Sequence, residues 1–116
     1  MRSYNNKTVL VTGGSGFIGA WIIRRLAKRG IEARVFDLNS NRATVADIAG
    51  ADLARDLDWR TGDIRKEDDV LRAAEGCDGV IHLAGVLTPQ CAADPVRGAE
   101  INLIGTLNVF AAAIHL

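Results

Sequence analysis

The chain has 116 residues, and its 14 basic and 14 acidic side chains give a formal net charge of zero. This balance argues against nucleic-acid binding, which needs an excess of Lys and Arg to neutralise phosphates. The length suits one small domain, the 48% apolar residues can supply its core, and no apolar run approaches the roughly 20 residues that span a bilayer.

Short apolar runs alternate along the sequence with longer segments of helical periodicity. The first run, residues 9–11, predicts a buried strand that ends at glycines, and Ile18, Ile22 and Leu26 then recur at helical spacing. The expected strands are residues 7–12, 32–38, 57–61 and 79–83. The expected helices are 17–29, one or two short helices within 40–55 broken near Gly50, 66–75, and a long helix from about 95 to 114 that follows a loop containing Pro89.

This alternation of strand and helix predicts a parallel sheet with right-handed crossovers and helices on both faces. The fold class is therefore α/β, a Rossmann-type doubly wound sheet with the strand order 3-2-1-4. We expect residues 1–116 to form one dinucleotide-binding domain that stops before a fifth strand.

The turn between the first strand and the first helix is rich in glycine. Gly13, Gly16 and Gly19 fit the pattern Gly-x-x-Gly-x-x-Gly, and Gly14 with the last two fits Gly-x-Gly-x-x-Gly. Glycine permits a tight turn and lets the backbone approach a diphosphate, while the start of the helix offers free N–H groups and the positive end of its dipole. A tight turn without a ligand is the alternative, but the strand before it and the helix after it favour a dinucleotide. The residues predicted to contact the cofactor here are Gly13, Gly14, Ser15, Gly16, Phe17, Ile18 and Gly19.

Asp37 ends the second expected strand, 18 residues after Gly19. A carboxylate at this place can accept hydrogen bonds from the adenosine ribose and repels a 2′-phosphate, so NAD is favoured over NADP. Arg34 and Arg42 are close in sequence and would weaken the exclusion of NADP. The alternative for Asp37 is a turn-forming residue before Asn39.

Two cysteines, Cys77 and Cys91, are too few for a disulfide framework. We expect reduced thiols in a cytoplasmic protein, in agreement with a polar N-terminal stretch, residues 1–7, that lacks the apolar segment of a signal peptide. The two histidines are far apart in the sequence, so no metal site is expected.

The segment Thr-Gly-Gly-Ser-Gly-Phe-Ile-Gly at 12–19 resembles the signature of the extended short-chain dehydrogenase/reductase family, the NAD-dependent epimerase/dehydratase group. Three further segments resemble motifs of that family in the same order. They are Gly-Asp-Ile at 62–64, His-Leu-Ala-Gly at 82–85 and Asn-Leu-Ile-Gly-Thr-Leu-Asn at 102–108.

The resemblance implies further contacts with the cofactor. Asp63 and Ile64 would lie by the adenine, and the alternative for Asp63 is a helix cap before Lys66. The last strand would end close beneath the nucleotide at Leu83, Ala84 and Gly85. The alternative interpretation of these residues is a turn without a ligand.

Three other residues of these motifs are expected to have supporting roles. Asn102 would support an active-site lysine through hydrogen bonds, unless it binds a nearby loop instead. His82 is expected to be a packed strand residue rather than a catalyst, and Gly105 to permit close contact between helix and sheet.

The family's chemistry uses a Ser/Thr and a Tyr-x-x-x-Lys pair, in which the tyrosine moves a proton while the nicotinamide takes or gives a hydride. The single tyrosine of this chain is Tyr4, and no Tyr-x-x-x-Lys occurs. We therefore expect the chain alone to be inactive and to be a fragment of a longer enzyme, with a natural truncation as the alternative.

The complete protein would act on a small-molecule substrate, a sugar nucleotide or a similar hydroxyl or keto compound. A non-catalytic, dinucleotide-binding redox sensor and a purely structural domain remain the competing interpretations. We expect no nucleic-acid or membrane partner. A homo-oligomer is expected, because a sheet that ends at the fourth strand exposes an unpaired edge.

Overall fold

The computed structural model describes residues 4–116, so residues 1–3 of the polar N-terminal stretch lie outside it. Four parallel strands form one sheet in the order β3-β2-β1-β4. Their bounds are Thr8–Thr12 for β1, Glu32–Asp37 for β2, Asp58–Thr61 for β3 and Gly79–His82 for β4. The structure thus confirms the predicted Rossmann-type arrangement and its strand order.

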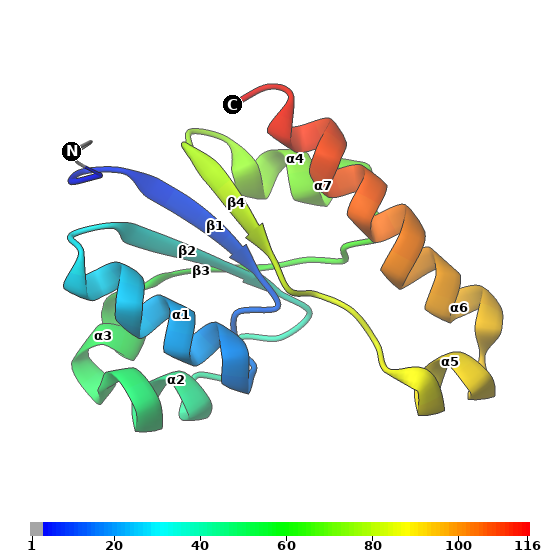
Figure 1. Ribbon diagram of the computed structural model, residues 1–116, viewed down its shortest axis with the longest axis horizontal. Coiled ribbons are helices and arrows are strands. Elements are labelled where there is room, and N and C mark those ends of the chain that lie inside the picture. The colour runs from blue at the N-terminus through cyan, green and yellow to red at the C-terminus, as the bar shows by residue number, and fades with distance from the viewer. Residues whose placement is uncertain (1–3) are drawn as a thin grey trace.

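Helices cover both faces of the sheet (Figure 1). One layer holds α1 (Phe17–Lys28), α2 (Ala43–Ala49) and α3 (Ala51–Asp56). The other layer holds α4 (Glu67–Ala74) and α7 (Gly105–Ala113). The break between α2 and α3 falls at Gly50, as predicted, where a φ of 103° favours glycine.

The core has two halves because neighbouring strand residues point to opposite faces of the sheet. Leu10 and Phe36 pack with the buried residues of α4 and α7. Val11 and Val35, each next to one of them in sequence, pack against α1, α2 and α3. All four side chains are almost completely buried, so the central strands β1 and β2 anchor both layers.

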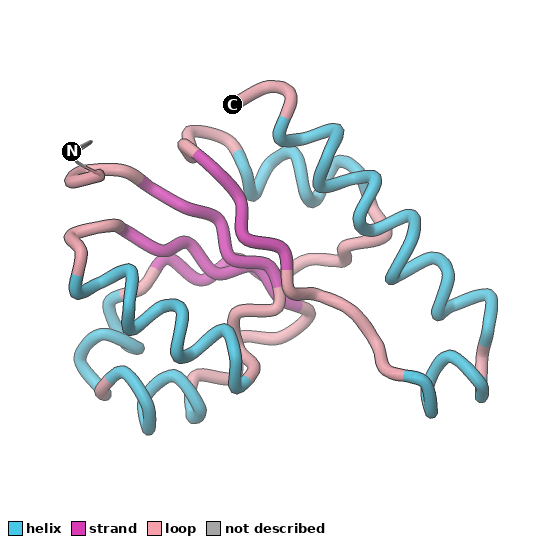
Figure 2. Tube along the Cα trace, viewed as in Figure 1, coloured by secondary structure: helices cyan, strands magenta, loops and turns pink. Residues whose placement is uncertain are grey.

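The segment after β4 differs from the prediction in two ways. The expected loop around Pro89 contains a short helix, α5 (Thr88–Ala93), which tolerates the proline because the first N–H groups of a helix have no intrahelical partner. The expected long helix is present but consists of α6 (Pro95–Ala99), the π-helical turn η1 (Glu100–Ile104) and α7. Figure 2 shows it as one continuous coil.

The π-helical turn widens the helix by one residue, since the N–H of Gly105 donates to the carbonyl of Glu100, five residues earlier. Such a turn changes which side chains face the sheet on either side of it. Sequence periodicity at 3.6 residues does not reveal it. Within residues 4–116, none of the helices is both long and apolar enough to cross a membrane.

Candidate cofactor site

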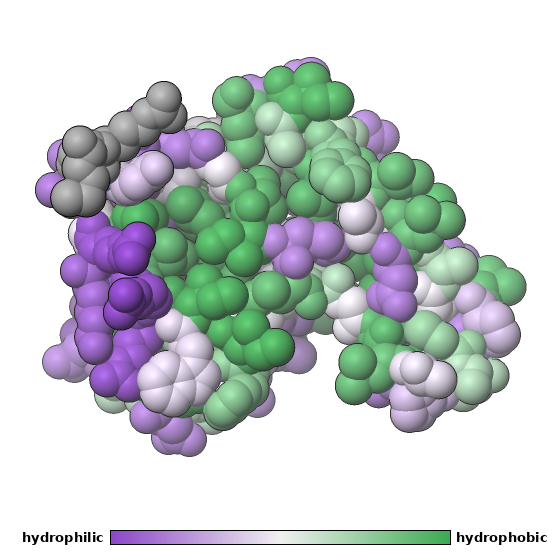
Figure 3. Space-filling view, viewed as in Figure 1, coloured by the Kyte–Doolittle hydropathy of each residue, from purple (hydrophilic) through white to green (hydrophobic). Residues whose placement is uncertain are grey.

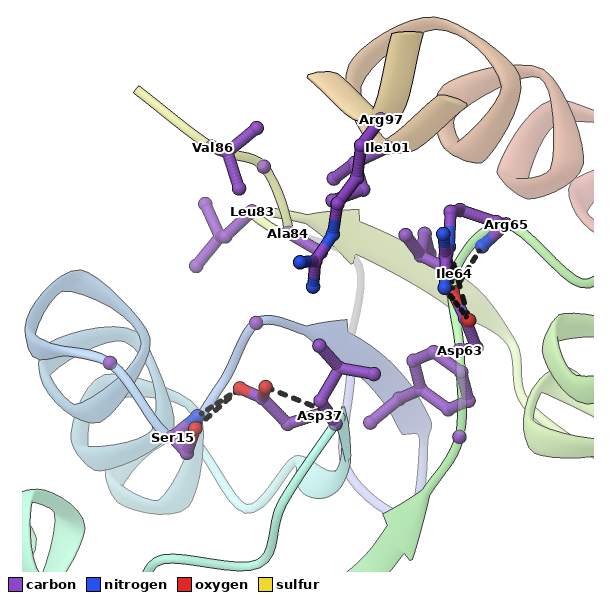
Figure 4. Close-up of a pocket in the computed structure, with 16 residues that line it drawn as sticks. Ser15, Asp37, Asp63, Ile64, Arg65, Leu83, Ala84, Val86, Arg97 and Ile101 are labelled. Atoms are coloured by element: carbon purple, nitrogen blue, oxygen red, sulfur yellow. Dashed lines mark hydrogen bonds and ion pairs between the residues drawn. The ribbon is translucent and has the colours of Figure 1, made fainter. Parts of the chain in front are cut away.

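A pocket of about 330 Å³ lies at the carboxyl edge of the sheet (Figure 4). Residues that end or directly follow each of the four strands line it, which is the usual ligand position in open α/β folds. Nine of the predicted contact residues line this pocket: Gly13, Ser15, Gly16, Asp37, Asp63, Ile64, Leu83, Ala84 and Gly85. Four segments that are distant in sequence therefore meet at one cavity.

Gly13 makes the turn that ends β1. Its φ of +69° is in the left-handed region, and a Cβ there would lie 2.8 Å from the backbone nitrogen of Ala84. Its N–H donates to the carbonyl of Phe36 at 2.8 Å. The requirement for glycine at this position comes from the backbone conformation and from the close approach of the segment after β4.

Gly14 and Gly19 face away from the pocket and serve packing. A Cβ on Gly14 would lie 2.8 Å from Val35 Cγ1, and one on Gly19 would lie 2.6 Å from the Cα of Gly14. The close contact made by Gly19 is thus with the turn itself. Neither glycine lines the cavity. Both allow close packing of the turn, Gly14 against β2 and Gly19 against Gly14.

Gly16 is the residue of the turn whose missing side chain leaves open space. A Cβ on it would have one neighbour within 4 Å, the carbonyl oxygen of Gly13 at 3.5 Å. Its φ of −83° is accessible to any residue. Among the four glycines of the turn, only Gly13 has a positive φ. The tight turn therefore requires the conformational freedom of glycine at that one position.

The first turn of α1 presents free amides. The first intrahelical hydrogen bond runs from Ala20 N to Gly16 O, which leaves the N–H groups of Phe17, Ile18 and Gly19 without helical partners. The side chains of Phe17 and Ile18 are 67% and 64% exposed and do not line the pocket. Their predicted contact with the cofactor therefore rests on their backbone alone.

Asp37 lies beside the glycine turn and is already held in place. Its Oδ2 accepts a hydrogen bond from the Ser15 hydroxyl and another from the Ser15 N–H at 3.3 Å, and its Oδ1 accepts from Leu38 N at 2.8 Å. Figure 4 shows the carboxylate turned toward Ser15. These bonds join the end of β2 to the turn, so the proposed ribose and phosphate positions are coupled.

Both arginines near Asp37 in sequence have partners other than Asp37. Arg34 is bonded to Asp58 at 3.0 Å and to the carbonyls of Ala73 and Glu75. Arg42 stacks on the ring of Trp59, 5.4 Å from its centroid. The cations that we expected to soften the exclusion of a 2′-phosphate thus have other partners.

Asp63 lies on the pocket wall opposite Asp37 and is paired with Arg65. The closest atoms of the two side chains are 2.7 Å apart, and Arg65 also reaches Glu100 at 3.3 Å. The Arg65 guanidinium holds the pKa of the Asp63 carboxyl below its usual value. Asp63 does not cap α4, whose N-cap residue is Lys66, so the alternative role as a helix cap is wrong.

Asn102 holds the segment after β4 instead of pointing into the cavity. Its Oδ1 accepts from Val86 N at 2.9 Å and its Nδ2 donates to Val86 O at 3.0 Å. This matches the predicted alternative, a bond to a nearby loop. The residue lies in the π-helical turn η1, so the turn positions the pocket wall at Gly85 and Val86.

Gly105 and His82 connect α7 to the rest of the fold. A Cβ on Gly105 would lie 2.9 Å from Ile64 Cγ1, so the close contact is with the segment after β3 rather than with the sheet. His82 Nδ1 lies 2.6 Å from Thr12 Oγ1, and its Nε2 lies 3.1 Å from Thr106 Oγ1. Burial lowers the pKa of the imidazole, as suits the structural role predicted for it.

The structure adds lining residues that the sequence did not assign to the cofactor. Phe36, Leu38 and Gly62 are sequence neighbours of the predicted Asp37 and Asp63, so their position could have been inferred from those motifs. Arg97 and Ile101 come from α6 and η1 and carry no sequence signal for this role. Within residues 4–116, no group of three His, Cys, Asp or Glu side chains is arranged to hold a metal ion.

The fold is of the Rossmann type, and its pocket lies at the carboxyl edge of the sheet. The sequence model of the NAD dependent epimerase/dehydratase family matches residues 9–116. The chain belongs to this family.

Curated relatives agree with the family assignment. The chain is 38% identical over 113 residues to UDP-glucose 4-epimerase 3 of Oryza sativa subsp. japonica, which covers 90% of this chain and 30% of the rice protein. It is 32% identical over 118 residues to an Arabidopsis thaliana bifunctional UDP-glucose and UDP-xylose 4-epimerase, covering 95% and 34%. The chain thus spans about a third of the length of the curated relatives it matches.

Solved structures share the fold. Pen from Bacillus thuringiensis is 31% identical with a TM-score of 0.85, over 98% of this chain and 37% of that one. The UDP-glucose 4-epimerase of Thermus thermophilus, determined in complex with NAD, is 34% identical with a TM-score of 0.73, over 90% of this chain and 33% of that one. The chain corresponds to the N-terminal portion of such proteins.

Proposed function

We propose that the pocket at the carboxyl edge of the sheet binds NAD. The observation that carries this proposal is the convergence of three features on one cavity. The turn at Gly13–Gly16 offers open space for a diphosphate, and the first turn of α1 offers it free amides. Asp37 offers a carboxylate for the ribose, and the segment after β3 offers a wall for the adenine. The NAD complex of a structural relative supports the same cofactor.

NAD is favoured over NADP because of the charge around Asp37. Its carboxylate would repel a 2′-phosphate, and Arg34 and Arg42, the cations nearby in sequence, are bound elsewhere. The site residues fit the adenosine half of the dinucleotide. When bound, the nicotinamide would supply the chemistry by taking or giving a hydride.

For the complete protein we propose an epimerase, dehydratase or dehydrogenase activity on a sugar nucleotide or a similar hydroxyl or keto compound. The relatives named UDP-glucose 4-epimerase support this substrate class. The part described here would hold the cofactor and exclude water from the adenine and the diphosphate. Its single tyrosine is Tyr4, so we propose that the 116-residue chain binds the cofactor without turning over substrate.

Isothermal titration calorimetry of the chain with NAD, NADP and UDP tests this proposal. We expect saturable binding of NAD, weaker binding of NADP and no heat from UDP. The absence of NAD binding at millimolar concentration, together with a folded circular dichroism spectrum, would contradict the proposed function.

A further inference from the structure

Arg97 is a cation in the pocket that neither the glycine motif nor the comparisons assign. It lies in α6, and its side chain lines the cavity together with Gly13, Ser15 and Gly16. In Figure 4 the guanidinium extends from the helix into the space between Ala84 and Asp37. The backbone of Arg97 is fixed by its N–H, which donates to Asp94 Oδ1 at 3.1 Å.

The charges around the pocket are unevenly paired. Asp63 is neutralised by Arg65, which also contacts Glu100. Within residues 4–116, Asp37 receives hydrogen bonds from Ser15 and Leu38 and forms no ion pair. Among the residues that the structure describes, no carboxylate pairs with Arg97. The pocket therefore holds one cation that is not committed to a protein partner.

A dinucleotide would bring two negative charges into this space. The glycine turn can offer backbone amides and a helix dipole to the diphosphate, but it carries no basic side chain. A guanidinium is well suited to a phosphate because its planar donors can bind two oxygens at once. Arg97 approaches from the opposite wall, so a diphosphate on the turn would lie between the amides and the guanidinium.

We propose that Arg97 binds the diphosphate of the dinucleotide and closes the pocket over it from the α6 side. This inference rests on the proposed function, and it assigns a cofactor-binding role to a residue outside the recognised motifs. The dinucleotide is a better match than the diphosphate of a substrate nucleotide because Arg97 shares its cavity with the glycine turn and Asp37.

The test compares ligands with and without a diphosphate on the wild-type chain and the Arg97→Gln variant. Titration with NAD, ADP-ribose, ADP and adenosine is performed at low ionic strength. We expect Arg97→Gln to weaken NAD, ADP-ribose and ADP by about tenfold or more and to leave adenosine unchanged. Arg97→Lys should recover part of the loss because it restores the charge but not the paired donors.

Arg25→Gln is the matched control, because Arg25 is an exposed residue of α1 that does not line this pocket. It removes the same charge and should leave all affinities unchanged. Equal loss for adenosine and ADP in Arg97→Gln would show that Arg97 contacts the base and would overturn the proposal. Unchanged NAD affinity would also overturn it.

These outcomes are distinct from failure of the proposed function. If the wild-type chain binds no NAD, the function itself is contradicted. If the wild type binds NAD and the Arg97→Gln variant binds it equally well, the function stands and only the role of Arg97 falls.

Discussion

Single residues of the glycine turn have different physical reasons for being glycine. Gly13 is required by its positive φ and by the backbone after β4, while Gly14 and Gly19 are required by packing. Gly16 has neither constraint, and the space beside it belongs to the pocket. This difference separates residues that hold the fold from a residue that leaves room for a ligand.

The first prediction concerns Gly16→Val. Its extended backbone accepts a β-branched residue, so the free energy of unfolding should change by less than about 1 kcal/mol. The isopropyl group would occupy the space expected for a phosphate, and NAD binding should be lost. Chemical denaturation and calorimetry measure the two effects. A variant that still binds NAD with wild-type affinity would contradict the placement of the diphosphate.

The second prediction concerns the ribose position. Asp37→Ala should weaken NAD by about 1–3 kcal/mol, the scale of lost charged hydrogen bonds, and should reduce the difference between NAD and NADP. Asp47→Ala is the control, because Asp47 is an exposed carboxylate of α2 outside the pocket. Competitive titration provides both affinities. If Asp37→Ala left the two affinities unchanged, the ribose would have to lie elsewhere.

At the scale of elements, a short chain of polar contacts joins β1, β4 and α7. Thr106 donates its hydroxyl proton to the carbonyl of Asn102 at 2.7 Å, so His82 Nε2 must be the donor in its contact with Thr106. His82 Nδ1 then accepts from the Thr12 hydroxyl. Thr12 in turn accepts from the N–H groups of Leu83 and Ala84. This arrangement needs a neutral imidazole.

The third prediction is that acid weakens this connection. Because burial lowers the pKa of His82 in the folded chain, the unfolded chain binds more protons, and stability rises with pH in that window. The stability contributed by the neutral His82 imidazole is fully present above the unfolded pKa of about 6.5. It is lost as the pH falls through the lower, folded pKa.

Urea unfolding between pH 7 and pH 5 measures this effect. His82→Gln should flatten the pH dependence, while His115→Gln, a change at an exposed histidine, should leave it as in the wild type. Asp63, whose folded pKa is also lowered, loses its contribution only as the pH falls below the usual aspartate pKa of about 4 toward its own lower folded pKa. An identical slope in wild type and His82→Gln would contradict the assignment.

The elements that sequence reasoning placed correctly are those with strong local signals. The buried runs at Val9–Val11 and Val35–Phe36, together with the stop at Gly50, have physical causes that lie within a few residues. The π-helical turn and the helix after Leu87 depend on tertiary contacts, among them the bonds of Asn102 to Val86. No periodicity in the sequence encodes those contacts.

The same distinction applies to the pocket. The motifs predict Gly13, Asp37 and Asp63 because each ends or follows a strand, and parallel strands bring their carboxyl ends to one edge. Arg97 could not be found in this way. Its place in the pocket depends on the path of the segment from β4 through α5, which sets where α6 begins.

At the scale of the whole molecule, apolar side chains remain on the surface. Leu103, Leu107, Phe110 and Ile114 are more than half exposed along the helix that ends in α7. Figure 3 shows apolar surface over α7 and across the middle of the same face. Strand β4 is also an edge of the sheet among the described residues. Exposed apolar surface of this kind favours association.

The fourth prediction is therefore that the chain self-associates. Sedimentation velocity over a range of concentrations should show mass increasing with concentration, and Phe110→Lys should shift the equilibrium toward monomer. Asp47→Lys, an exposed change on the other helical layer, should leave the distribution unchanged. A single monomeric species throughout the range would contradict the homo-oligomer proposal.

The central claim is that a dinucleotide's diphosphate rests on the backbone amides between β1 and α1. Titration of the ¹⁵N-labelled chain with NAD, followed by two-dimensional NMR, tests it most directly. We predict that the amide signals of Ser15, Gly16, Phe17, Ile18 and Asp37 shift as NAD is added, and that these shifts reach a plateau at high NAD concentration. Saturable shifts that cluster elsewhere and leave these amides unmoved would contradict the account.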